Sequence, residues 1–212
     1  MLRLVKDLYY SFLPIQKRFE RINARNQWGS AESVSGSGST LANTDNIRAA
    51  LPSLFAELGV RKVVDVACGD FNWMSHVVAE TGIDYVGFDI VPAQVEANMA
   101  RYGGPNVRFE VFDITCGVPD APADLVLFRD CMLHLSFAHG QAALRNISQM
   151  QAKWVLLSNY SNVPQNSDIP TGRHRMIDVC KAPYILPNPK RKIDENEDSK
   201  ALSLWERQSL VR

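Results

Sequence analysis

Short apolar runs alternate with segments of helical periodicity through the middle of the chain. Runs rich in valine, isoleucine and aromatic residues predict strands near residues 61–67, 84–89, 107–112, 123–129 and 153–158. Apolar residues that recur at every third or fourth position predict helices near 44–59, 71–81, 92–102 and 137–150. Alternation of strands and helices with short connections predicts an α/β fold, in which a mostly parallel sheet is covered by helices on both faces.

Local signals refine the first helix and the end of the chain. Thr44 is a candidate N-cap, Pro52 predicts a kink or a restart, and Gly59 predicts the C-terminal stop. Two apolar segments, PYILP at 183–187 and ALSLWERQSL at 201–210, are separated by a charged stretch. We expect them to form an antiparallel pair of strands at one edge of the sheet.

Residues 1–43 differ from the rest of the chain, so we divide it into 1–43 and a core domain at 44–212. Leu4, Leu8, Phe12 and Ile15 fall near helical spacing, which predicts a helix that covers the core or a partner subunit. The Gly/Ser-rich run GSAESVSGSGST that follows is either a lid or a linker. Lys6 and Asp7 interrupt the N-terminal apolar stretch. No run reaches the roughly 18–20 apolar residues of a membrane span, so we expect no stable membrane insertion.

Composition narrows the classes of partner. The 212-residue chain carries 23 Lys and Arg against 23 Asp and Glu, so global charge gives no argument for nucleic acid. Its four cysteines are widely spaced, without a zinc-type cluster, so we expect no metal. Reduced thiols fit a cytoplasmic protein.

Charged residues follow four successive predicted strands. Asp65 lies in the first, Asp89 and Asp113 end the second and third, and Arg129-Asp130 ends the fourth. Because ligands of open α/β sheets bind beyond the carboxyl ends of the strands, we expect these groups to meet in one crevice. Any single acid among them has an ordinary reading as a cap or turn residue. The repetition favours a ligand site.

Each acid suits a nucleoside that bears a cationic amino-acid tail. Asp89 lies 24 residues after Asp65, close to the roughly 20-residue offset of a ribose-binding acid. Asp113 is then placed to accept from an adenine amine, and Asp65 to face positive charge. A nicotinamide-dinucleotide site fits less well, because two glycines of GxGxxG are absent and Asp70 would oppose a pyrophosphate. GSGST is not a P-loop, since it has no lysine.

These segments resemble the class I S-adenosylmethionine (SAM)-dependent methyltransferases over roughly residues 44–158. VVDVACGD resembles the first motif of that family, YVGFDI its ribose-binding acid, FEVFDI its adenine-contacting acid and ADLVLFRDCMLHL its fourth-strand motif. Ala67 departs from the usual glycine. WGSAESVSGSGST, CGDFNWM and FRDCMLHLS together resemble a small bacterial subgroup of unspecified substrate. The resemblance implies a Rossmann-like seven-stranded sheet with an antiparallel last strand. It also implies SAM contacts from Asp65, Ala67, Cys68, Gly69, Asp70, Asp89, Ile90, Asp113, Ile114 and Arg129.

The methyl acceptor is less well defined by the sequence. Asp130 and His134 would share a face of one helical turn. His134 is a candidate general base, although a packed histidine and a reaction without a base are alternatives. A lid would bring Gly38 and Ser39 to the methionine carboxylate of SAM. The candidate acceptor-binding residues are His134, Asn159, Tyr160, Asn162 and Arg175.

The resulting expectation is methylation of a small molecule at a hydroxyl oxygen. N-methylation of an amine or a protein side chain, and a non-catalytic SAM-binding module, are the alternatives. A homodimer is also compatible with the sequence.

Overall fold

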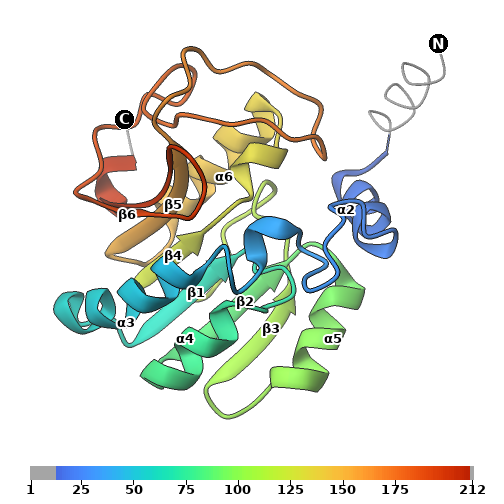
Figure 1. The fold of residues 1–212 in the computed structure, drawn as a ribbon, viewed down its shortest axis with the longest axis vertical. Coiled ribbons are helices and arrows are strands. Elements are labelled where there is room, and N and C mark those ends of the chain that lie inside the picture. Colours follow the sequence, from blue (N-terminus) through green and yellow to red (C-terminus); the bar gives the residue numbers. More distant parts are fainter. Residues whose placement is uncertain (1–12, 211–212) are drawn as a thin grey trace.

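Seven strands form one sheet in the computed structural model, which describes residues 13–210 (Figure 1). The strands are β1 Lys62–Val66, β2 Asp84–Asp89, β3 Val107–Val111, β4 Leu125–Phe128, β5 Trp154–Tyr160, β6 Arg191–Asp194 and β7 Lys200–Glu206. Their order is β3-β2-β1-β4-β5-β7-β6, with β1 to β5 parallel, β7 antiparallel to β5, and β6 antiparallel to β7. The predicted seven-stranded, mostly parallel sheet with an antiparallel last strand is confirmed.

Helices cover both faces of this sheet. Helices α3 Asp45–Leu58, α4 Met74–Thr81 and α5 Pro92–Tyr102 pack on one face, where Val63, Leu125 and Leu156 are buried. Helix α6 Phe137–Gln149 and parts of the 161–190 segment cover the other face, over Val64, Val126 and Val155. The central strands are therefore buried on both sides, which explains why they read as continuous apolar runs.

Predicted boundaries hold with local exceptions. Gly59 ends α3 in the left-handed conformation, as predicted, and Pro52 lies inside the helix without splitting it. Thr44 is the N-cap residue, but its hydroxyl donates to the Thr40 carbonyl 2.8 Å away instead of capping the helix. Helix α4 begins at Met74, later than predicted, because Phe71 has a φ of 58° that no helix accepts.

The predicted strand at 183–187 is wrong. This segment is a turn in which Tyr184 N donates to the Lys181 carbonyl, and it buries Tyr184 and Leu186 against the core on the α6 side. The strand that pairs with β7 is instead β6, a short and mostly exposed charged segment. Charge is common on edge strands because it discourages pairing with other chains. That charge also hid β6 from a search for apolar runs.

Helix α2, Ile15–Ala24, and the short helix η1, Ser37–Ser39, precede the core elements (Figure 1). The predicted helical positions Leu4, Leu8 and Phe12 lie outside the described residues. Within residues 13–210, no helix combines the length and apolarity that a membrane crossing requires. Short helices η2, Met132–His134, and η3, Arg207–Leu210, complete the described part.

Candidate functional site

A cleft opens at the carboxyl ends of β1, β2 and β4, where the strand order reverses. The structure brings many of the predicted site residues to its wall. Those that line it are Ser39, Asp65, Ala67, Cys68, Gly69, Asp89, Ile90, Arg129, Asp130 and His134. Three acids from three different strands or strand ends thus face one space.

The turn after β1 is tied to the end of β2 by Asp89. Asp89 Oδ2 accepts from Gly69 N and Oδ1 accepts from Val91 N, each at 3.0 Å. Each carboxylate oxygen has a second lone pair, so Asp89 can still accept hydrogen bonds from a ligand. Burial raises the pKa of Asp89, against the effect of these backbone amides. Ala67 has a φ of 74°, the left-handed region that glycine tolerates better, which accounts for glycine as the usual family residue there.

Asp65 is the most deeply buried acid of the cleft, with 4% of its surface exposed. Its Oδ2 accepts a hydrogen bond from the Tyr85 hydroxyl at 2.8 Å. Burial raises the pKa of Asp65 to about 7, and the neighbouring charge of Asp89 adds to this effect, while the Tyr85 bond and Arg129 oppose it. A cationic ligand beside Asp65 would favour its ionised form.

Asp130 belongs to a buried ion network. Lys200 Nζ lies 2.7 Å from Asp130 Oδ2, and Arg129 Nη1 lies 3.2 Å from the same oxygen. Arg129 and Lys200 also pair with Glu195, while Ser158 donates to Asp130 Oδ1 at 2.9 Å. Burial alone would raise the pKa of Asp130, but the two cations outweigh it and lower that pKa to about 2. Asp130 is therefore a fixed negative charge and a poor proton acceptor.

His134 stands at the other side of the cleft in η2. Its Nδ1 lies 2.9 Å from the Arg173 carbonyl oxygen, and its ring centroid lies 4.8 Å from that of Trp28 and 5.5 Å from that of His174. Burial lowers the pKa of His134 to about 4, although the Arg173 carbonyl acts in the opposite direction. The imidazole is therefore neutral near pH 7.

Residues 28–40, which we call the covering segment, pack across the glycine turn. Ser35 Oγ accepts from Asp70 N at 2.9 Å, and Arg129 Nη2 donates to the Gly38 carbonyl at 2.7 Å. A Cβ on Gly69 would lie 2.3 Å from Ser35 Oγ, so this approach requires glycine. The segment is therefore packed against the turn after β1 and the end of β4.

Several predicted residues do not line the cleft. Asp113 accepts from Thr115 N and from the Cys116 thiol within a local turn, and Ile114 is buried in the core. Gly38 accepts from Arg129 through its carbonyl, and Asp70 donates to Ser35 through its backbone amide. The predicted acceptor-binding residues Asn159, Tyr160, Asn162 and Arg175 also lie away from the cleft lining.

Their side chains have other partners. Asn159 accepts from Val179 N, and Tyr160 donates to Glu197. Asn162 accepts from Ser199. Arg175 donates to the Tyr184 hydroxyl and lies over the Phe137 ring. The geometry gives no support to acceptor binding at these four positions.

The wall opposite the strand ends was largely missed from the sequence. Phe19 and Asn23 of α2 line the cleft together with Trp28, Ser35 and Gln94. Asn23 Nδ2 donates to Gln94 Oε1 at 2.9 Å, which links α2 to α5. The apolar positions of the N-terminal helix predicted that it packs on the core or on a partner subunit. They did not indicate that residues of this helix line the cleft.

The residues that line the cleft fit SAM. Asp65, Asp89 and Asp130 supply negative charge and hydrogen-bond acceptors for a cationic nucleoside, and Ile90 and Cys131 add an apolar surface. Within residues 13–210, no group of three or more His, Cys, Asp or Glu side chains is placed to hold a metal ion.

Comparisons with known proteins agree with this fit. A family model described as a methyltransferase domain matches residues 39–188. Magnesium protoporphyrin IX methyltransferase (ChlM) of Synechocystis PCC 6803, solved with bound SAM, is 14% identical with a TM-score of 0.60, over 91% of this chain and 96% of that chain. No curated protein matches the sequence.

Two further solved structures match over part of their length. The SAM-dependent methyltransferase SibL is 15% identical with a TM-score of 0.60. An O-methyltransferase family protein from Burkholderia thailandensis is 14% identical with a TM-score of 0.59. Each match covers 77% of this chain and 55% of the other, so this chain spans about half of their length. Because the family model matches more than half of the chain, the chain belongs to the class I SAM-dependent methyltransferase family.

Proposed function

We propose that this enzyme transfers the methyl group of SAM to a hydroxyl oxygen of a small molecule, with His134 as the general base. The observation that carries the proposal is the neutral His134 imidazole in the wall of the cleft, with one ring nitrogen already engaged by a backbone carbonyl.

The hydrogen bond of His134 sets its tautomer. A backbone carbonyl can only accept, so Nδ1 of a neutral imidazole must carry the proton that is donated to Arg173 O. Nε2 is then left with a free lone pair, and the Trp28 ring holds the imidazole in place. A neutral imidazole with a fixed lone pair is suited to accept the proton of a hydroxyl group.

SAM, when bound, supplies a methyl group on a positively charged sulfur. The acceptor oxygen must lose its proton as it bonds to the methyl carbon, and His134 Nε2 is the group proposed to take that proton. Asp130 does not compete as a base, because its pKa is about 2. It contributes a fixed negative charge beside the sulfonium, and Asp65 and Asp89 add negative charge along the rest of the cleft when they are ionised.

The covering segment supports the same reaction by excluding water. Its contacts to Asp70 and Arg129 hold residues 28–40 over the strand ends. Positioning and solvent exclusion supply much of the acceleration of a methyl transfer, so a weak base is sufficient. We propose that Gly38 and Ser39 lie next to the methionine end of SAM.

The acceptor is expected to be small and at least partly apolar, because Phe19, Trp28 and His134 form a row of rings in the wall. The balanced charge of the chain does not favour nucleic acid. The O-methyltransferase family protein from Burkholderia thailandensis supports oxygen as the acceptor atom only by analogy of fold. Cytoplasmic location and a homodimer stay predictions.

The test is a screen of labelled methyl transfer to matched hydroxyl and amine compounds, with the methylated atom located by NMR. We expect labelled methyl ethers, and methylamines as the main products would overturn the assignment to oxygen. With the best acceptor, His134→Gln should lower kcat about 100-fold or more and change the Kd of SAM less than about threefold.

His174→Gln is the matched control. His174 is an exposed histidine whose ring stands 5.5 Å from that of His134, so this variant should keep kcat within about threefold of the unmodified enzyme. Equal kcat values for the two variants would refute the role of His134.

A further inference from the structure

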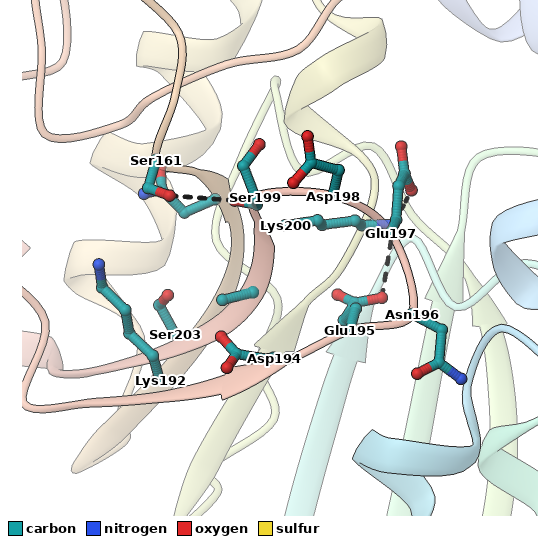
Figure 2. Close-up of a pocket in the computed structure, with 12 residues that line it drawn as sticks. Ser161, Lys192, Asp194, Glu195, Asn196, Glu197, Asp198, Ser199, Lys200 and Ser203 are labelled. Carbon is teal, nitrogen blue, oxygen red and sulfur yellow. Dashed lines mark hydrogen bonds and ion pairs between the residues drawn. The ribbon is translucent and has the colours of Figure 1, made fainter.

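A second cavity, of about 430 Å³, lies at the hairpin between β6 and β7 (Figure 2). It shares no lining residue with the SAM cleft. Lys192 and Asp194 of β6 stand opposite Ser203 and Ala201 of β7, so these four residues share one face of the hairpin. Residues 195–199 of the hairpin loop complete much of the wall.

Two buried oxygens in this wall have no hydrogen-bond partner within the described residues. Ser203 is 0% exposed, and its Oγ is unpartnered. The side chain of Glu195 is 1% exposed; its Oε2 pairs with Arg129 and Lys200, and its Oε1 is unpartnered. Ser203 lies on β7 opposite Lys192, whereas Glu195 lies at the loop end of the hairpin beside Lys200 (Figure 2). Buried polar atoms are almost always hydrogen-bonded, so two orphans in one cavity indicate a missing partner.

The charge of the wall indicates the sign of that partner. Four acids, Asp194, Glu195, Glu197 and Asp198, face two lysines, Lys192 and Lys200, which gives a net charge of −2. Lys200 is already paired with Asp130, Glu195 and Glu197. In residues 13–210, the side chains of Asp194 and Asp198 have neither an ion pair nor a hydrogen bond, and both are exposed to the solvent at the cavity.

We propose that this cavity is a second ligand site, which binds a small molecule through a primary ammonium group. An ammonium donates three hydrogen bonds, and the face of the hairpin that carries Asp194 and Ser203 offers it the Asp194 carboxylate and Ser203 Oγ as acceptors. A metal ion fits less well, because no set of three or more acidic, His or Cys side chains in the described part converges on a point.

The Glu195 carboxylate connects the proposed site to the ion network beside the SAM cleft. Glu195 offers Oε1 to the second cavity, and its Oε2 holds the Arg129 and Lys200 that pair with Asp130. The two cavities are therefore neighbours in one ion network but take different ligands.

The test is isothermal titration calorimetry of the full chain with putrescine as the probe. 1,4-Butanediol is the matched neutral compound and succinate the matched anion. We expect saturable 1:1 binding of putrescine and none of the other two. Asp194→Asn and Ser203→Ala should each weaken putrescine binding about fivefold or more, whereas Glu80→Gln, an exposed acid on α4, should leave it within about twofold.

Asp194→Asn is expected to fold like the unmodified protein, because Asp194 is exposed and its side chain has no partner in residues 13–210. Each variant should show a thermal unfolding transition before its binding is measured. Equal affinity for putrescine and 1,4-butanediol, no saturable putrescine binding up to about 10 mM, or unchanged affinity in both variants would overturn the proposal. The titration contains no SAM and no methyl acceptor, so its result is independent of the hydroxyl assignment.

Discussion

The affinity for SAM should rise with pH through neutrality, because Asp65 must be ionised to attract a cation. Burial raises the pKa of Asp65 to about 7 in the ligand-free protein. At that pKa, about 10% of the molecules carry an ionised Asp65 at pH 6 and about 90% at pH 8. If SAM binds only the ionised form, its apparent Kd falls up to about tenfold between these pH values.

Asp65→Asn isolates this effect. The amide oxygen can still accept the Tyr85 hydrogen bond, but the side chain no longer titrates. Titrations of SAM itself, of Asp89 and of His134 are common to both proteins. They therefore cancel in the ratio of the two Kd values, which should grow up to about tenfold between pH 6 and pH 8.

Calorimetry supplies a second measure of the same event. At pH 7, binding to the unmodified enzyme should release about half a proton more than binding to Asp65→Asn, as measured in two buffers of different ionisation enthalpy. A Kd ratio that does not change with pH would refute the reasoning. So would equal affinity of the two proteins at pH 8.

The raised pKa of Asp65 also affects stability, which should fall as the pH rises while the affinity for SAM increases. The pKa of Asp65 is about 7 in the folded protein and has its ordinary value of 3.8 in the unfolded chain, so the folded protein holds the proton more tightly. The stabilising contribution of the neutral form is fully present below about pH 4 and is lost as the pH rises to about 7. The difference corresponds to roughly 4 kcal/mol. Asp65→Asn should therefore unfold at a higher urea concentration than the unmodified enzyme at pH 8, and their midpoints should converge at pH 4.

Two further predictions concern the rest of the site. Asp89→Asn should raise the Kd of SAM about 10-fold or more, because the ligand loses a charged acceptor. Asp84→Asn, at the exposed far end of the same strand, should leave the Kd unchanged. Equal calorimetric Kd values for the two variants would exclude the ribose-binding role of Asp89. Lys200→Met should lower the free energy of unfolding by about 3–5 kcal/mol, because it leaves Asp130 without its closest cation in a buried network; a loss below about 1 kcal/mol in urea titrations would contradict this.

The sheet could be predicted from the sequence because its central strands have strong local signals. Strands buried on both faces, such as β1 and β4, are mostly apolar, so their pattern marks them directly. β6 is an edge strand of four residues whose charged side chains are mostly exposed to the solvent, so it has no apolar pattern by which to recognise it. The opposite error at 183–187 arose because Tyr184 and Leu186 pack in the core from a turn. Burial alone does not distinguish a turn from a strand.

The cleft could be predicted on one side only. Asp65 lies near the end of β1 and Asp89 ends β2, and the fold makes these strands neighbours, so the meeting of the two acids is a consequence of topology. The partners of Asp130 could not be found in the same way. Lys200 is 70 residues further along the chain, and nothing local in its surroundings indicates that it reaches the end of β4.

These partners resolve a conflict within the sequence interpretation. Arg129 was predicted to contact the cofactor, yet a free guanidinium would repel a cationic sulfonium. In the structure its donors are directed to Glu195 and to the Gly38 carbonyl, and its plane lies over the Trp73 ring.

Arg129 and Lys200 carry two positive charges, and Asp130, Glu195 and Glu197 carry three negative ones, so the network they form has a net charge of −1. The cleft therefore stays negative although a buried arginine stands in its wall. We therefore propose that Arg129 holds the covering segment in place through its hydrogen bond to the Gly38 carbonyl, and that the acids around it attract SAM.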